Sequence, residues 1–183
     1  MAGQERIDAS QADALLRRFR RKPLFAEAGL SSVVAYGPDI VRLLLPHRPP
    51  LLLVDRITGI DLGARRIAGR RYLDPADPVF SGHFPDFPLY PGTLQVEATG
   101  QLGLCLRYFD STGSVEAPTS QFGLNVRATR VLGAYYGEPA EPGTELTLLA
   151  EILSFDGYFA SMIGQCLSGD RVTSVSAGEV LFV

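Results

Sequence analysis

The chain has 183 residues, of which 46% are hydrophobic and 20% charged, and its formal net charge is −3. This composition is typical of a single globular domain with a buried core, and the negative charge argues against general binding to nucleic acid. Because no apolar stretch approaches the roughly 20 residues of a membrane span and the N-terminus lacks the basic-then-apolar order of a signal peptide, we expect a cytoplasmic protein without a membrane span.

The sequence offers no pattern for a metal or a bound cofactor. Its two cysteines, Cys105 and Cys166, are too few and too distant to indicate a disulfide framework or a zinc site. Both are expected to be small buried side chains. A Gly-rich phosphate loop and a Cys/His cluster with ligand spacing are also absent from the sequence. We therefore expect no metal and no cofactor.

The N-terminal residues predict a short amphipathic helix over 10–22. Ser10 is its expected N-cap, and four apolar residues recur at helical spacing: Ala12, Leu15, Leu16 and Phe19. Residues 17–22 are the most basic segment of the chain, which suits a helix C-terminus because the macrodipole is negative there. Pro23 then ends the helix.

The following residues lead into the core of the fold. Residues 31–38 are expected to be irregular, and Asp39 is expected to cap a single helical turn. Two strands then follow, over 51–57 and 66–73, joined by a turn at Gly63.

The second half of the chain predicts one helix and four strands. Residues 74–91 contain prolines 75, 78, 85, 88 and 91, so we expect a rigid loop without regular structure. The stretch 93–109 predicts a helix that is largely buried, because its apolar residues lie on most sides of a helical projection. After a linker over 110–118, four strands are expected at about 120–132, 144–155, 158–168 and 171–183. This order predicts an α+β fold in which an antiparallel sheet wraps around one helix.

Residues 82–101 bring together groups that suit proton chemistry beside a carbonyl. His83 is the candidate base, since a neutral imidazole with a pKa near about 6.5 accepts a proton at neutral pH. Glu97 is the candidate acid, because burial in an apolar helix disfavours its charged form. The free N–H groups where the helix begins, at Gly92, are positioned to polarise a carbonyl. Gln101, one turn beyond Glu97, is expected to orient its carboxyl group.

Two blocks of this sequence resemble the 3-hydroxyacyl-acyl-carrier-protein dehydratases of fatty-acid synthesis. They are Leu45-Pro46-His47-Arg48-Pro49 with Leu52-Leu53-Val54-Asp55-Arg56, and Gly82-His83-Phe84-Pro85 with Pro88, Tyr90-Pro91-Gly92, Glu97-Ala98 and Gln101. The resemblance implies the hot-dog fold over residues 39–183, with residues 1–38 as an N-terminal helical extension. It also implies dehydration of a (3R)-3-hydroxyacyl thioester to the trans-2-enoyl thioester, with the acyl group linked through phosphopantetheine to acyl carrier protein.

The resemblance further implies a homodimer in which His83 and Glu97 meet across the interface. A glutamate at 97, rather than an aspartate, is similar to the branch of the family that dehydrates without isomerising the double bond. His47 is expected to be structural, in a packed turn before a strand. Asp55 and Arg56 are expected to form a local ion pair.

The sequence departs from the family pattern beside the motif and on the expected carrier-binding surface. Asp86-Phe87-Pro88 stands where the family usually has Gly-Lys-Pro, which removes a cation and leaves a specialised lipid or polyketide pathway open. Two basic segments are candidates for binding the acidic surface of the carrier: Arg127 with Arg130, and the helix end that includes Arg17 and Arg21.

Two other functions remain compatible with these residues. A hot-dog acyl thioesterase would also use a carboxylate on the central helix, with water in place of the C2 proton. A non-catalytic partner subunit that binds acyl chains is the other alternative. The His-Phe-Pro loop favours dehydration over the first, and the presence of both His83 and Glu97 argues against the second.

Overall fold

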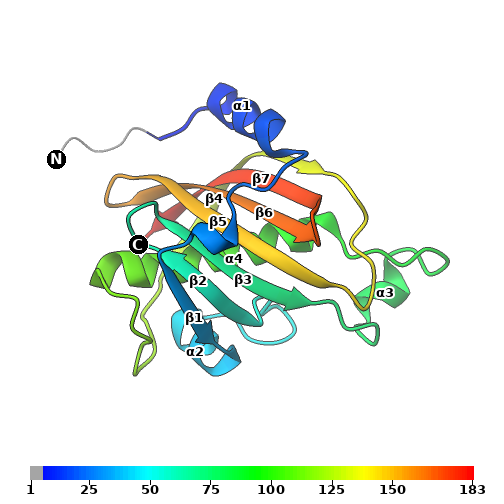
Figure 1. Ribbon diagram of the computed structural model, residues 1–183, viewed down its shortest axis with the longest axis horizontal. Coiled ribbons are helices and arrows are strands. Elements are labelled where there is room, and N and C mark those ends of the chain that lie inside the picture. The colour runs from blue at the N-terminus through cyan, green and yellow to red at the C-terminus, as the bar shows by residue number, and fades with distance from the viewer. Residues whose placement is uncertain (1–5) are drawn as a thin grey trace.

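The computed structural model describes residues 6–183, which form one seven-stranded sheet curled around a long helix (Figure 1). The order across the sheet is β1-β2-β3-β5-β6-β7-β4, and neighbouring strands are antiparallel. The strands are Ser32–Tyr36 (β1), Arg56–Asp61 (β2), Arg66–Tyr72 (β3), Val126–Tyr136 (β4), Glu145–Phe155 (β5), Phe159–Ser168 (β6) and Arg171–Phe182 (β7). The predicted α+β hot-dog fold is confirmed.

The central helix α4, Gly92–Thr112, holds the main core together. Its buried apolar residues include Ala98, Leu102, Leu106 and Phe109, which pack against the inner face of the sheet. The helix ends where Gly113 takes a left-handed conformation (φ 64°) that most residues avoid. The prediction of a largely buried helix here is confirmed, with α4 one residue longer at its start and three at its end.

Both cysteines are buried and free, as expected from their apolar surroundings. Burial raises the pKa of each thiol, that of Cys166 to about 12. Since the reactive form of cysteine is the thiolate, both thiols are chemically inert at neutral pH.

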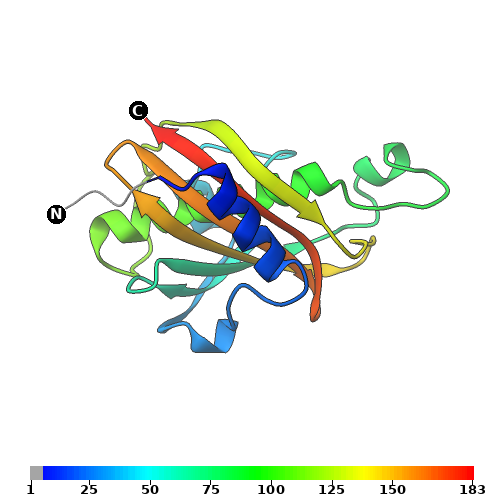
Figure 2. The ribbon, with the colours of Figure 1, turned by 90° about the horizontal axis from the view of Figure 1, so that it is seen from above.

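Helix α1, Ala9–Phe19, lies on the outer face of the sheet, across β4 and β7 and opposite to α4 (Figure 2). Its N-cap is Asp8, so the prediction of Ser10 is wrong. The Asp8 carboxylate accepts the Gln11 N–H, and the Gln11 side chain accepts the Asp8 N–H, each at 2.8 Å. This reciprocal pair satisfies two N–H groups at once. Arg20 is the C-cap, so the helix is also shorter than the expected 10–22.

A buried glutamine on β6 fastens the N-terminal segment to the outer face. Gln165 accepts the Leu24 N–H at 2.6 Å and donates to the carbonyl oxygens of Phe19 and Lys22 at 2.8 and 2.9 Å. Around it, a second apolar cluster forms between this segment and the strands, with Phe19, Leu24, Phe25, Leu149, Ile163 and Val175 among its members.

Two predictions for the strands before α4 are wrong. Residues 32–36, expected to be irregular, form β1 and pair with β2. The expected strand over 51–57 begins only at Arg56, because the side chain of Gln101 takes the backbone groups of Leu51 and Leu53 that a neighbouring strand would otherwise use.

The short helices also differ from expectation. Helix α2, Pro38–Leu44, has Gly37 rather than Asp39 at its N-cap. One turn of helix, α3 (Val79–Gly82), and a 3-10 turn at Glu27–Gly29 complete the helical elements of the described residues. The α3 turn interrupts the proline-rich loop that was expected to lack regular structure. Among residues 6–183, no helix has the length and apolar character to cross a membrane.

After α4, the last three strands match their predicted positions closely, whereas β4 starts six residues later than expected and runs four residues further. The expected ion pair between Asp55 and Arg56 is wrong. Asp55 pairs with Arg71 at 3.0 Å, and Arg56 pairs with Glu145 at 2.8 Å. Neighbouring side chains in extended backbone point to opposite sides, so each residue finds a partner on another strand.

Replacing Gln165 by alanine should destabilise the protein by about 2–4 kcal/mol, because it leaves buried backbone groups of the N-terminal segment without partners. Urea unfolding of the full chain measures this change. Gln11→Ala is the matched control, since that glutamine is exposed and its capping contact is worth about 1 kcal/mol or less. A Gln165→Ala effect no larger than the control's would show that the anchor contributes little.

Candidate active site

His83 follows α3 directly, and its backbone and side chain are both held in place. Its N–H donates to the Val79 carbonyl at 2.8 Å, and its ring Nδ1 lies 2.9 Å from the Leu89 carbonyl oxygen. A carbonyl oxygen only accepts, so the ring hydrogen sits on Nδ1. The lone pair is then on Nε2, which is the arrangement that a general base needs.

The residue after His83 is held in an unusual conformation. Phe84 has φ 65°, in the left-handed region, and its ring centroid lies 4.1 Å from that of the histidine. Such a conformation costs a bulky residue on the order of 1 kcal/mol or more and is concentrated at functional sites. The His-Phe-Pro turn is therefore a strained turn that fixes the imidazole from one side.

His83 and the start of α4 line one cavity of about 150 Å³, together with Tyr90 and Tyr136. No side chain caps this helix start, so its first N–H groups have no side-chain partner, and Gly92 lines the cavity at the positive end of the helix dipole. A side chain at Gly92 would overlap the ring of Tyr136. The space beside this glycine is thus occupied by the Tyr136 ring. Burial raises the pKa of Tyr90, which keeps its hydroxyl neutral.

Glu97 lies on α4 with 48% of its side chain exposed. The expectation that the single chain buries it is therefore wrong. Neighbouring positions on the helix, such as Ala98 and Gln101, are buried.

Gln101 makes the contact with Glu97 that its spacing predicts. Its Nε2 donates to Glu97 Oε1 at 2.8 Å and to the Leu51 carbonyl at 2.7 Å, while its Oε1 accepts the Leu53 N–H at 2.9 Å. Both amide hydrogens are used, and the side chain is 1% exposed. The amide is fixed, and it fixes one oxygen of the carboxyl group.

His47 lies beside the same carboxyl group, 3.6 Å from its Nε2 to Glu97 Oε1. The expectation of a purely structural histidine overlooked this neighbour. Fifty residues separate the two, so no sequence spacing predicts the contact. The one available signal was that the chain has only two histidines and both fall within the motif blocks.

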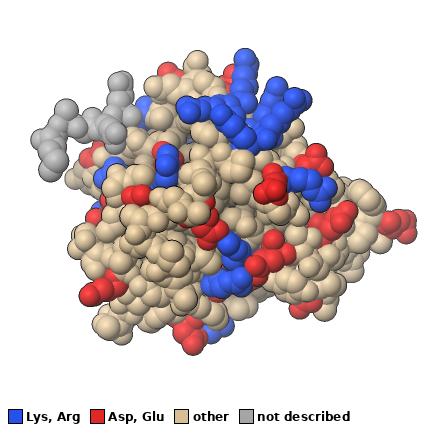
Figure 3. All heavy atoms as spheres, in the orientation of Figure 1, with Lys and Arg blue, Asp and Glu red and all other residues tan. Residues whose placement is uncertain are grey.

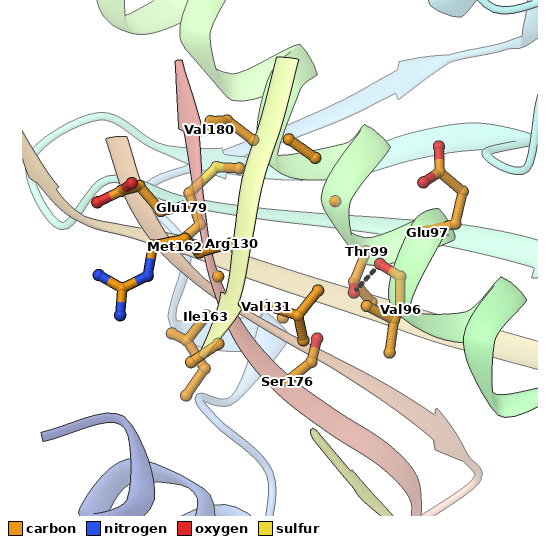
Figure 4. A pocket seen from close by; sticks show the side chains of 15 residues that line it. Val96, Glu97, Thr99, Arg130, Val131, Met162, Ile163, Ser176, Glu179 and Val180 are labelled. Carbon is orange, nitrogen blue, oxygen red and sulfur yellow. Dashed lines mark hydrogen bonds between the residues drawn. The ribbon is translucent and has the colours of Figure 1, made fainter. Parts of the chain in front are cut away.

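The single chain does not bring His83 and Glu97 together. Glu97 lines a different cavity, of about 130 Å³, between α4 and the strands β4, β6 and β7 (Figure 4). The walls of that cavity are largely apolar and include Val96, Val131 and Met162. Five residues along a helix correspond to a rotation of about 140°, which places Gly92 and Glu97 on different sides of α4. The expectation that spacing alone puts the three groups within reach is corrected here.

The candidate carrier-binding residues lie in two separate places. Arg17 and Arg21 are exposed at the end of α1, where basic side chains gather at the top of the molecule (Figure 3), and Arg17 is paired with Asp13 at 2.7 Å. Arg127 and Arg130 are exposed on β4, and Arg130 also lines the cavity of Glu97.

Comparisons with known proteins identify the relatives of this chain. Residues 45–165 match the model of the FabA-like domain. The 3-hydroxyacyl-[acyl-carrier-protein] dehydratase FabZ of Chlamydia trachomatis serovar L2 is 32% identical over 147 residues, which cover 80% of this chain and 91% of that protein. FabZ of Variovorax paradoxus is 35% identical over 129 residues, covering 70% and 82%.

A solved structure shares the fold. The dehydratase heterocomplex ApeI:P from Xenorhabdus doucetiae superposes with a TM-score of 0.53 at 19% identity, over 78% of this chain and 90% of that one. At this identity the likeness concerns the fold alone. The family match spans both motif blocks and the central helix, and the FabZ relatives exceed 30% identity over most of their length. The chain therefore belongs to the FabA-like family of dehydratase domains.

Proposed function

We propose that this protein dehydrates (3R)-3-hydroxyacyl groups carried on acyl carrier protein, giving the trans-2-enoyl thioester, in fatty-acid or specialised lipid biosynthesis. The observation that carries the proposal is the hydrogen bond from His83 Nδ1 to the Leu89 carbonyl, which leaves Nε2 free to act as a base. The FabZ relatives, by their names, act on the same class of carrier-bound substrate.

The base step uses the cavity at the start of α4. The thioester carbonyl accepts a hydrogen bond from the Gly92 N–H, and the helix dipole stabilises the negative charge that grows on its oxygen. His83 Nε2 then takes the proton from C2. The electron pair of that C–H bond moves toward the carbonyl.

The acid step uses Glu97. Its carboxyl group gives a proton to the C3 hydroxyl, the C3–O bond breaks, and water leaves as the C2–C3 double bond forms. His83 now holds the proton from C2 and Glu97 is a carboxylate. Return of that proton to Glu97 through solvent restores both groups, so the net change is loss of one water.

In this proposal, His83 of one subunit and Glu97 of the other meet across a homodimer interface. Strand β4 is at the edge of the sheet, is eleven residues long, and is mostly exposed. An edge of that length is an open template for a second strand, and two-fold pairing of β4 with its copy would continue the sheet. The pairing would also cover the exposed Glu97 carboxyl group and supply its desolvation.

The substitutions His83→Ala and Glu97→Gln should each lower the rate of water loss by about 10²- to 10⁴-fold without unfolding the protein. The measurement follows the acyl mass of 3-hydroxyacyl carrier protein. Release of free acid by the unmodified enzyme would favour a thioesterase instead, and no change at several chain lengths would favour a non-catalytic partner.

Mixing these two inactive variants tests whether the site is shared. In a mixed dimer, one of the two sites has both His83 and Glu97 intact, so random exchange of subunits should restore about a quarter of normal activity. Mixing would restore nothing if each chain formed its own complete site.

Charge placed on the proposed interface should separate the subunits. Val131 on β4 is 66% exposed, and Val131→Asp should convert dimers to monomers in analytical ultracentrifugation because it buries a carboxylate in an apolar contact. Val33→Asp is the matched control, since Val33 is 90% exposed on β1 at the opposite edge. Unchanged dimers in the Val131 variant would remove β4 as the interface.

For the carrier we favour the basic end of α1. Leu16 packs on Gly133 of β4, and Tyr136, three residues further along that strand, lines the cavity of His83. Arg17 and Arg21 therefore lie toward the same end of the sheet as the proposed base. Arg127 and Arg130 lie on the edge that the second subunit would cover.

Charge reversal of Arg17 and Arg21 together should raise KM for carrier-bound substrate by about tenfold at low salt, with the difference shrinking as salt rises. KM for a short pantetheine thioester should stay the same, since it has no carrier. Arg42→Glu on α2, at the other edge of the sheet, is the control. A larger effect from reversing Arg127 and Arg130 would move the docking surface to β4.

A further inference from the structure

The two oxygens of the Glu97 carboxyl group have unequal surroundings. Oε1 accepts the Gln101 amide hydrogen and faces His47 Nε2, whereas Oε2 has no hydrogen-bond partner within residues 6–183. Because Gln101 holds Oε1, this oxygen cannot also reach a substrate. Oε2 is thus the oxygen available to carry the proton for the leaving hydroxyl.

The surroundings of His47 select its tautomer. Its Nδ1 is buried and has no partner in the described part of the chain, while its Nε2 points at the carboxyl oxygen. A buried N–H without an acceptor costs more than a buried lone pair at that position. This geometry places the ring hydrogen on Nε2, which faces the Glu97 carboxyl oxygen.

We propose that His47 is a positioning residue that acts through Glu97. The inference rests on the proposed dehydration. At 3.6 Å the contact is longer than a hydrogen bond, so the His47 N–H and Glu97 Oε1 can still move closer together. Once Oε2 has given up its proton, the negative charge spreads to Oε1 and attracts the His47 N–H into a charge-assisted hydrogen bond. His47 thereby stabilises the carboxylate that the acid step creates.

Gln101 and His47 both donate toward Glu97 Oε1, but they do so at different stages of the reaction. Gln101 is fixed by Leu51 and Leu53 and binds Oε1 at 2.8 Å throughout. His47 gains its bond only when charge develops. An interaction that strengthens during the reaction lowers the barrier, whereas one that is constant mainly fixes geometry.

The proposal requires the chain's two histidines to be opposite tautomers, His83 with hydrogen on Nδ1 and His47 with hydrogen on Nε2. Long-range ¹H–¹⁵N correlation of the full chain distinguishes these forms, and His47→Gln assigns the two ring systems because only two histidines exist. Glu97→Gln should shift the His47 signals and leave those of His83 in place. A hydrogen on Nδ1 of His47, or no response to Glu97→Gln, would overturn the proposal.

Kinetics of two His47 variants provide the second test. Glutamine keeps an N–H donor close to the position of Nε2, and methionine has similar bulk without a donor. His47→Met should lower kcat by about 10- to 100-fold with little change in KM, and His47→Gln should restore most of that loss. If kcat fell equally in both variants, His47 would have to move a proton itself. If both variants kept the kcat of the unmodified enzyme, His47 would only fill space.

These readouts separate failure of this inference from failure of the proposed function. If the unmodified enzyme removes no water, the dehydration proposal fails, while the tautomer measurement still decides whether His47 donates toward Glu97. If water is lost but the tautomer is the opposite one, the positioning role alone is overturned. A variant that fails to fold leaves the tautomer measurement on the unmodified protein unaffected.

Discussion

The buried amide of Gln101 is the interaction on which the rest of the site depends. It joins the backbone of residues 51–53 to the middle of α4 and uses its remaining hydrogen bond to hold Glu97. Since those backbone groups bond to a side chain, this stretch cannot join the sheet until Arg56. The loop before it carries His47, which is how a residue fifty positions away comes to lie beside the carboxyl group.

Gln165 performs a similar function on the outer face. It too is a buried glutamine whose amide bonds to backbone groups of a segment that is not a strand, in this case the chain that follows α1. In both places a single polar side chain on a rigid element satisfies groups that would otherwise be buried unpaired. Gln101 holds the Glu97 carboxyl group, and Gln165 holds the segment after α1 on the sheet.

The geometry of α4 separates the two proposed catalytic groups within a single chain. The helix presents Gly92 to the cavity of His83 and Glu97 to another cavity, because successive residues rotate around its axis. An exposed edge strand borders the second cavity. In the proposed mechanism, a second copy of the chain supplies the group that this site lacks and covers the exposed Glu97 carboxyl group.

Short-range sequence patterns determined much of the secondary structure and one contact in the candidate site. The proline-free apolar run predicted α4, turn residues placed the last three strands, and the spacing from Glu97 to Gln101 predicted their contact, since each depends on neighbours within a turn or a hairpin. Tertiary structure decided the rest. The pairing of β1, the exposure of Glu97, the separation of His83 from Glu97 and the place of His47 all depend on residues far apart in the chain. The local sequence pattern does not show which distant surface covers a side chain, because burial depends on how the complete fold packs.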